Sequence, residues 1–240
     1  MALHHNPRIV TAGLKMLLDP ADKVSYPGTG TSMIDVSGNG FDASLNDGVT
    51  ANLGYLHFVD SADDVSINIP LNIPREKTLT FWIRTNRPLS TADNFEIGFL
   101  NVGPTQGSMF GMMYGVGNCQ DMGYWGYGAS YDMSVEAVNN RWSSDGNWHS
   151  CTITMNSSRA VRVWIDGVRK NWLKHSDYGT VVSEVAMPID TTNNFLINSR
   201  AGWNSGFTYV DIGQVAVYDR ALSEDEIVHN YNVLKGRYAI

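Results

Sequence analysis

The sequence has little charge, and basic residues are the scarcer kind. Charged residues make up only 17% of the 240 residues, with 17 Lys and Arg against 24 Asp and Glu, so the formal net charge is −7. Proteins that bind nucleic acid neutralise phosphates with a basic surface. The charge balance therefore argues against nucleic acid as a main partner.

Cysteine is also scarce, and long apolar runs are absent from the sequence. The two cysteines, Cys119 and Cys151, form no Cys-x-x-Cys motif, which argues against a zinc site and a disulfide-rich scaffold. We expect two free thiols, with a disulfide between them as the alternative. No run is long enough to span a bilayer, and residues 1–8 do not resemble a signal peptide, so we expect synthesis in the cytosol and no membrane insertion.

Hydrophobic and turn-forming residues, by contrast, are abundant. Hydrophobic residues make up 43% of the chain, and there are 23 Gly, 11 Tyr and 7 Trp. Short runs of alternating polarity, such as 65–69, 79–83, 148–155 and 161–165, predict strands. We expect one all-β domain over residues 13–240, preceded by an N-terminal arm over residues 1–12.

The last quarter of the chain predicts a strand that leads into one helix. Apolar residues alternate up to Tyr218, and afterwards Leu222, Ile227 and Tyr231 follow a helical spacing. Ser223 stands three residues before Glu226, which is the spacing of a capping box. The pattern therefore predicts a short C-terminal helix that begins at Ser223. A further local signal, Asp166-Gly167 between two apolar runs, predicts a type I′ hairpin turn.

Several motifs in order resemble laminin-G-like domains of the concanavalin A-like lectin/glucanase superfamily. They are GLKMLLDPADKVSYPGTGTSMIDVSGNGFDASL, LHFVDSADDVSI, LTFWIR, WHSCTITM, VRVWIDG and VAVYDRALSEDEI. The resemblance implies a jelly-roll β-sandwich with a short C-terminal helix. The two ends of the chain are most similar to a subgroup found in structural proteins of tailed bacteriophages. These ends read NPRIVTAGLKM and YDRALSEDEIVHNYNVLKGRY.

Motifs for catalysis are missing. Glucanases of this superfamily carry Glu-x-Asp-x-(x)-Glu on one strand, which places the carboxylates on one face. None of the six glutamates stands in that pattern, and Glu224 and Glu226 belong to the helix start. Gly-x-Ser-x-Gly is absent as well. We expect no enzymatic activity, and a glucanase-like enzyme is the alternative.

A structural calcium ion is a second candidate that the resemblance suggests. Asp35 and Asn39 of DVSGNG, with Asp64 of SADDV, could supply oxygen ligands. However, the closing strand of such domains typically carries Asp after Ile, and here Gly213 follows Ile212. We therefore favour the interpretation in which Asp35 and Asn39 stabilise their own turn, and we expect no cofactor.

Aromatic residues among glycines are the third candidate. Four of them lie in DMGYWGYGASYDM, and RAGWNSGFTY adds a tryptophan beside an asparagine. Sugar rings stack on exposed aromatic rings, and aromatics are also enriched at subunit contacts. The expected carbohydrate-binding or partner-binding residues are Tyr124, Trp125, Tyr127, Tyr131, Trp203 and Asn204. His149 and His175 have no evident acidic or metal partner in the sequence, and His57 and His229 lie in structural segments, so we expect structural or surface roles for all four.

Together these features predict a non-enzymatic bacteriophage virion protein, either a capsid decoration or a tail or fibre adhesin module. Its expected partners are other virion proteins, host-surface glycans and further copies of itself. A stand-alone lectin is the remaining alternative.

Overall fold

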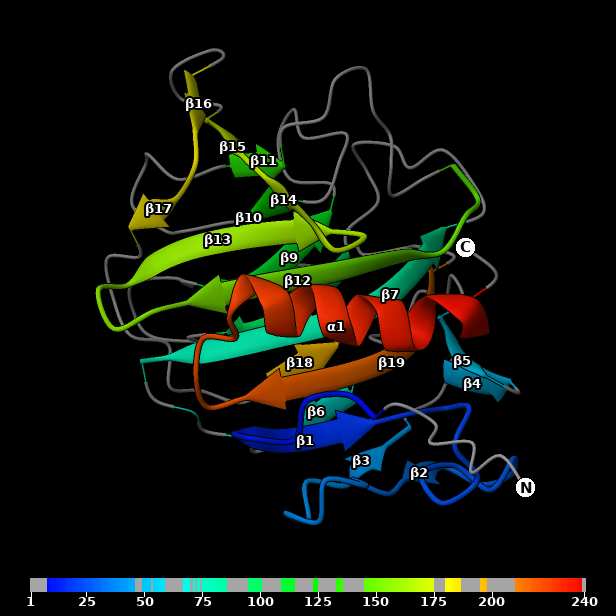
Figure 1. The fold of residues 1–240 in the computed structure, drawn as a ribbon. Helices are drawn as coiled ribbons and strands as arrows, with labels where there is room; N and C mark the ends of the chain where they lie inside the picture. The colour runs from blue at the N-terminus through cyan, green and yellow to red at the C-terminus, as the bar shows by residue number, and fades with distance from the viewer. Residues whose placement is uncertain are drawn as a thin grey trace, which may run out of the picture.

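The computed structural model shows an antiparallel β-sandwich with one helix on its outside (Figure 1). The described residues are 8–45, 49–52, 54–58, 67–69, 71, 73, 75–85, 95–100, 109–114, 123–124, 133–135, 145–174, 180–186, 195–197 and 210–238. Among them, one sheet has nine strands, a second has eight, and two short strands form a separate ribbon.

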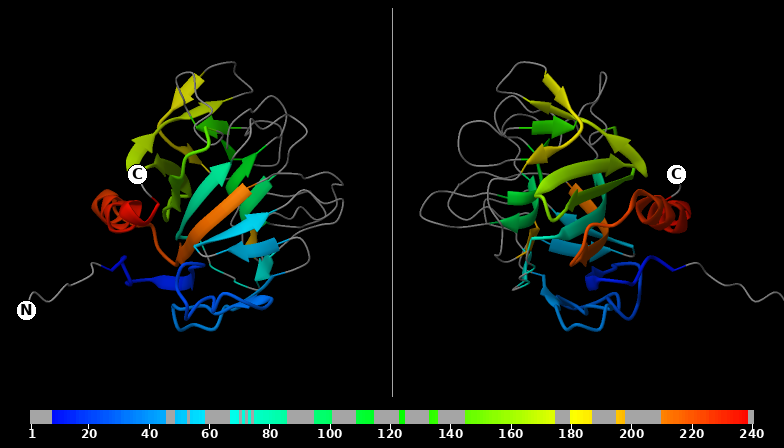
Figure 2. Two further views of the ribbon diagram at one scale, coloured as in Figure 1. Left: turned by 90° about the vertical axis from the view of Figure 1, so that its right-hand side faces the viewer. Right: turned by 60° about the vertical axis from the view of Figure 1, so that its left-hand side comes forward.

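The larger sheet carries the helix on its outer face. Its strands are, in spatial order, β14 (Val168–Lys170), β13 (Ala160–Ile165), β12 (His149–Met155), β7 (Lys77–Thr85), β19 (Val210–Tyr218), β5 (Tyr55–Phe58) and β4 (Val49–Asn52), with β1 (Leu14–Leu18) beside β19 and β17 (Val185–Ala186) beside β13. The predicted strands of this sheet are thus confirmed within a few residues. Figure 2 shows the helix lying on the side of this sheet that faces away from the smaller sheet.

The smaller sheet forms the second layer. Its strands are β16 (Thr180–Val182), β15 (Trp172–Lys174), β11 (Met133–Val135), β10 (Gly123–Tyr124), β9 (Met109–Tyr114), β8 (Phe95–Leu100), β18 (Phe195–Ile197) and β6 (Ile67–Ile69). The ribbon consists of β2 (Ser32–Met33) and β3 (Ala43–Ser44). Strands β2, β3, β4, β10, β11, β16 and β17 were not predicted, because segments of two to four residues rarely show a period.

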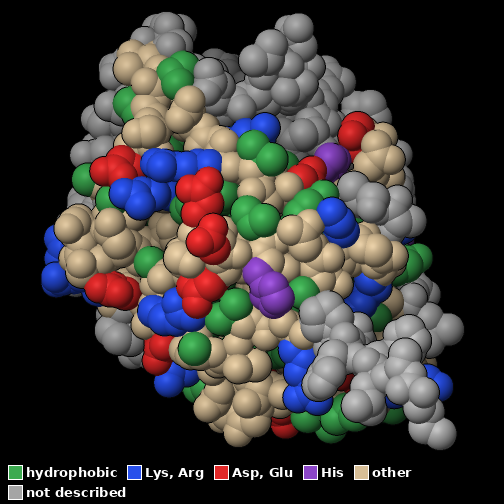
Figure 3. Space-filling model, viewed as in Figure 1, with side chains coloured by type: hydrophobic (Ala, Val, Ile, Leu, Met, Phe, Trp, Pro, Cys, Tyr) green, Lys and Arg blue, Asp and Glu red, His purple; other side chains and the backbone are tan. Residues whose placement is uncertain are grey.

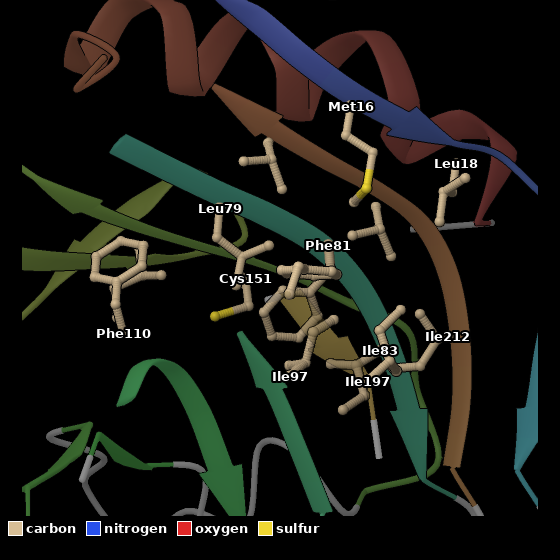
Figure 4. Close-up of a cluster of buried hydrophobic side chains, with 14 of the residues drawn as sticks. Met16, Leu18, Leu79, Phe81, Ile83, Ile97, Phe110, Cys151, Ile197 and Ile212 are labelled. Atoms are coloured by element: carbon tan, nitrogen blue, oxygen red, sulfur yellow. The ribbon is translucent and has the colours of Figure 1, made fainter. Parts of the chain in front are cut away.

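The main core lies between the two sheets. Alternate residues of β7 and β19 point inward, among them Phe81, Ile83 and Ile212, and they meet Ile97 and Ile197 of the smaller sheet (Figure 4). Each of these five side chains is at most 1% exposed. A β-bulge between Ile212 and Val215 keeps both of these residues on the inner face of β19. Cys151 of β12 is a free thiol in this core, as expected, and burial raises its pKa.

The C-terminal helix α1 (Glu224–Leu234) starts where the sequence predicts. The Ser223 hydroxyl accepts a hydrogen bond from the Glu226 N–H, and the Glu226 carboxylate accepts one from the Ser223 N–H, so the capping box is confirmed. Arg220 holds the same carboxylate through two hydrogen bonds of 2.7 and 2.8 Å. These bonds lower the pKa of Glu226 to about 2. A 3₁₀ turn, η2 (Lys235–Arg237), follows the helix.

The helix covers the outer face of the larger sheet through two apolar clusters. Ile227 packs with Trp164 and Tyr218, while Leu234 packs with Trp82 and Tyr238. Trp82 and Tyr238 stack with ring centroids 4.2 Å apart. A Cβ atom on Gly213 would collide with the Tyr238 hydroxyl, so this phenol fills the space of a side chain at position 213.

Part of the expected N-terminal arm also lies against α1. The Val10 N–H donates to the Asn230 side chain at 2.8 Å, and the Tyr218 hydroxyl donates to the Val10 carbonyl at 3.0 Å. Arg220 donates to the Ala12 carbonyl at 2.9 Å. Residues 8–12 are therefore tied to the domain, whereas residues 1–7 lie outside the described part. No helix in the described part of the chain is long and apolar enough to cross a membrane.

The Asp166-Gly167 turn is confirmed as type I′. It joins β13 to β14 with Ile165 paired to Val168, and both turn residues have positive φ, 52° and 72°. The turn contacts α1, since Gly167 faces the Tyr231 ring.

Candidate functional site

Three polar residues form a row across neighbouring strands of the larger sheet. His57 of β5 is paired with Asp211 of β19, and Asp211 is paired on its other side with Arg84 of β7. Because the flanking residues of each strand point into the core, these three side chains lie on the outer face. We call His57, Asp211 and Arg84 the charged row. It lies at the end of the sheet where β19 and β12 begin, on the right in Figure 1.

The centre of the charged row is a buried carboxylate. The Asp211 side chain is 2% exposed, whereas those of Arg84 and His57 are 26% and 28% exposed. Nε and Nη2 of Arg84 donate to Oδ2 at 2.9 and 2.5 Å, and Nδ1 of His57 lies 2.5 Å from Oδ1. A buried carboxylate is tolerated because it is paired and hydrogen-bonded. Two basic side chains thus share one acid.

Two half-buried rings flank Arg84, and we call them the aromatic pair. The guanidinium carbon lies 5.2 Å from the Tyr55 ring centroid and 4.9 Å from that of Trp148. The two rings meet edge to face at 5.9 Å, and Trp148 also contacts Tyr238 at 4.9 Å. Such distances fit cation–π contacts. The aromatic pair therefore fixes the plane and position of the Arg84 guanidinium.

A second acid–base group lies beside Trp148, and we call it the histidine clasp. Nδ1 of His149 is 2.7 Å from Oδ2 of Asp166, and Nε2 is 3.2 Å from Oδ1 of Asp145. Burial by itself lowers the pKa of His149, but hydrogen bonds and charge from Asp166 and Asp145 outweigh it, so the pKa lies above its ordinary value. The expectation that His149 has no acidic partner was wrong. One partner is four residues away, and the other comes from the β13–β14 turn.

Most of the predicted aromatic site lies outside the described residues. Tyr124 belongs to β10 and is paired with Met133 of β11, so residues 125–132 connect two antiparallel neighbours in the smaller sheet. Trp125, Tyr127 and Tyr131 fall in that connection and are not described.

Trp203 and Asn204 are likewise outside the described residues, in the segment between β18 and β19. Strands β8 to β11 alternate in direction, and β18 runs antiparallel to β8. The ends of β10 and β18 therefore lie at opposite ends of the smaller sheet. The segment with Trp203 leads into β19, whose second residue is Asp211.

Asp35 and Asn39 hold their own loop together. Oδ1 of Asp35 accepts hydrogen bonds from the Leu17 and Ser37 N–H groups, and Oδ2 accepts from the Ser37 hydroxyl and the Phe41 N–H. The Asn39 amide donates to the Leu14 and Lys15 carbonyls. The interpretation that these side chains stabilise their turn is confirmed.

These residues do not fit the calcium site that the resemblance suggests. Both oxygens of Asp35 are engaged within the loop, and the Tyr238 hydroxyl fills the side-chain space at Gly213. Within the described ranges no three His, Cys, Asp or Glu side chains are grouped to hold a metal ion. Asp64 lies outside the described residues.

The sequence analysis missed the charged row. Its members are separated by 154 and 127 positions, so no local motif joins them. One signal was present: Asp211 is a single acidic residue in the otherwise uncharged strand VDIGQVAVY. An acid in such a strand needs a basic partner on a neighbouring strand.

Comparison with known proteins identifies the family. A family model described as the concanavalin A-like lectin/glucanases superfamily matches residues 59–228. No curated protein sequence matches the chain. Among solved structures, a Trypanosoma rangeli sialidase in complex with sialic acid is similar, with a TM-score of 0.64 and 17% identity over 95% of this chain and 34% of that one.

Two further solved structures are similar as well. The binding domain of Paraclostridial Mosquitocidal Protein 1 has a TM-score of 0.59 and 18% identity over 92% of this chain and 52% of that one. The HCR/D W1238A mutant has a TM-score of 0.56 and 16% identity over 93% and 51%. This chain thus spans about a third of the sialidase and about half of the other two chains. These likenesses concern the fold alone, and the family match over residues 59–228 shows that the chain belongs to the concanavalin A-like lectin/glucanase superfamily.

Proposed function

We propose that the chain is a non-enzymatic module that binds carbohydrate. The observation that carries this proposal is the placement of the aromatic-rich residues 125–132 as the connection between paired strands β10 and β11 of the smaller sheet. Connections between strands are where binding residues concentrate, and aromatic rings stack on the apolar faces of sugars. The similar sialidase, solved with sialic acid, and the similar binding domain of the mosquitocidal protein are consistent with a binding role for this fold.

The lack of enzymatic activity is part of the proposal. Glycosidases need two carboxyl groups that face the substrate, one of them protonated. Three acids of the described part of the chain already have basic partners: Glu226 bonds Arg220, Glu184 bonds Arg162, and Asp211 bonds Arg84. The low pKa of Glu226, about 2, is the opposite of what a general acid requires.

We further propose that the module works on a bacteriophage particle, in contact with other virion proteins. The support is the resemblance of the C-terminal segment, Tyr218 to Tyr238, to phage structural proteins. This segment is integral to the domain, since Tyr231, Leu234 and Tyr238 pack with Trp82. Mass spectrometry of purified particles from the source should detect the polypeptide, and its absence from them would contradict this role.

A glycan array tests the binding role. We expect the unsubstituted chain to retain at least one glycan and Trp125→Ala to lose it, because truncating a central aromatic typically costs about 2 kcal/mol or more of binding. Val168→Ala is the matched control, since Val168 is 56% exposed on β14. A chain that binds no glycan, or that releases reducing sugar from polysaccharides, would contradict the proposal.

A further inference from the structure

The charged row leaves one edge of the Arg84 guanidinium unused. Nε and Nη2 both point at Oδ2 of Asp211, which occupies one edge of the group. The edge formed by Nη1 and the second proton of Nη2 has no acceptor among the described residues. A guanidinium edge with two parallel N–H groups matches the two oxygens of a carboxylate. The structure therefore presents a carboxylate-shaped donor edge, on a side chain that is 26% exposed.

Several contacts hold this edge in place before any ligand arrives. Asp211 is buried on one side of the guanidinium, and the Tyr55 and Trp148 rings lie within 5.2 Å of its carbon atom. Trp148 is in turn fixed by Tyr238, at 4.9 Å. A side chain held in this way loses little conformational freedom on binding, which favours affinity.

We propose that the unused edge of Arg84 binds the carboxylate of an acidic saccharide, with the sugar ring against the aromatic pair. The proposal goes beyond the proposed function, because it adds a second carbohydrate site, on the outer face of the larger sheet, to the one proposed on residues 125–132. The rings of Tyr55 and Trp148 are half-buried beside the cationic edge, so part of each ring remains accessible. A carboxylate on a sugar ring combines the two features that these side chains match.

The charge of the site also favours an anion over a neutral ligand. Because Asp211 is 2% exposed and Arg84 is 26% exposed, the solvent-facing part of this ion pair is the cationic guanidinium. The positive charge at Arg84 is a local feature of the surface, since acidic (red) and basic (blue) side chains lie side by side on the face shown in Figure 3.

The test compares acidic sugars with their neutral counterparts by calorimetric titration. The probes are sialyllactose against lactose, and a glucuronate-containing tetrasaccharide against its carboxyl-reduced form. We expect at least one acidic probe to bind about tenfold or more tightly than its counterpart, as one charge-assisted hydrogen-bond pair would give. Arg84→Lys keeps a cation beside Asp211 but removes the planar edge, and should abolish this preference.

Arg162→Lys is the matched control, because Arg162 bonds Glu184 on the same sheet but away from the aromatic pair. It should leave the preference unchanged. If Arg84→Lys does not fold, the Nε–H resonance of Arg84 and the indole N–H resonance of Trp148 in the unsubstituted protein report the same contact. Both should shift with the acidic probe and not with the neutral one.

The inference and the proposed function fail in different ways. Equal binding of acidic and neutral sugars, or a preference that survives Arg84→Lys, overturns the acidic-sugar site and leaves carbohydrate binding intact. Selective binding of an acidic peptide with no response to either sugar also overturns it. No binding of any sugar overturns both.

Discussion

The outer face of the larger sheet has two regions with different chemistry. Under α1 the face is buried and free of ion pairs among the described residues: Ile227, Trp164 and Tyr218 pack together, each less than 5% exposed, beside the buried threonines Thr78 and Thr152. Where β19 and β12 begin, the same face carries the charged row and the half-buried aromatic pair. One sheet thus uses one region for packing and leaves the other partly open, with its charges paired.

The difference shows how the helix divides the sheet. Helix α1 supplies the apolar cover that the first region needs, and its last turn reaches Trp82 and Tyr238, next to Trp148. Beyond the last turn of α1, the helix no longer covers the outer face, and a buried carboxylate there must be paired and hydrogen-bonded. Arg84 and His57 provide these bonds to Asp211, and their partly exposed side chains leave polar groups at the surface that can bind a ligand.

The charged row is tested most directly by removing its acid, Asp211. We expect Asp211→Ala to lower the free energy of unfolding by about 3 kcal/mol, because it leaves two basic side chains without their buried partner. Urea denaturation measures the loss. Glu184→Ala, which breaks the exposed pair with Arg162, should cost at most about 1 kcal/mol. Equal losses would mean that Asp211 is not the centre of the row.

The packing of α1 on the sheet is tested by truncating a buried side chain of the helix. Ile227→Ala should cost about 2 to 3 kcal/mol, since Ile227 is 2% exposed and its loss leaves a cavity over the sheet. The neighbouring Val228 is 36% exposed, and Val228→Ala should change stability by less than about 0.5 kcal/mol. Thermal melting distinguishes them. Similar effects would place α1 differently on the sheet.

A smaller effect is expected at the start of the helix. Ser223→Ala removes the hydroxyl that accepts from the Glu226 N–H and should cost about 1 kcal/mol. Ser157→Ala in an exposed turn should leave the melting temperature unchanged. An unchanged melting curve for Ser223→Ala would mean that the capping box adds nothing to the stability of the domain.

The histidine clasp should make stability depend weakly on pH. The pKa of His149 is raised in the folded chain. The contribution of His149 to the free energy of unfolding is therefore fully present below the pKa of the unfolded chain, about 6.5, and is lost as pH rises through the folded pKa. The melting temperature of the unsubstituted protein should therefore fall more than that of His149→Gln when pH is raised from about 6 to about 9. Parallel pH curves for the two proteins would contradict the clasp.

The smallest effect is expected from metal removal. The Asp35 oxygens are engaged by the loop itself, and Tyr238 fills the space at Gly213. Treatment with EDTA should therefore leave the melting temperature almost unchanged. A fall of many degrees that calcium reverses would show that Asp35 and Asn39 are ligands after all.

Much of the fold was predictable because its signals are local. The alternation in residues 210–218, the Ser223 capping box and the Asp166-Gly167 turn each depend on residues within a few positions of one another. The loop interpretation of Asp35 was predictable for the same reason, whereas the bonds of Asn39 to Leu14 and Lys15 span 25 and 24 positions. Strands of two or three residues, such as β10 and β17, were not, since pairing with a neighbour alone holds them extended.

Periodicity, caps and turns act over short distances, so the amino-acid sequence alone specifies the longer strands, the helix and the family of this protein. Which polar residues meet follows only from the folded arrangement of the strands. His57, Arg84 and Asp211 come together because β5, β7 and β19 are neighbours in one sheet and their register sets the three residues side by side. Strand order and register arise from burying all the strands at once, so no segment of the sequence contains them.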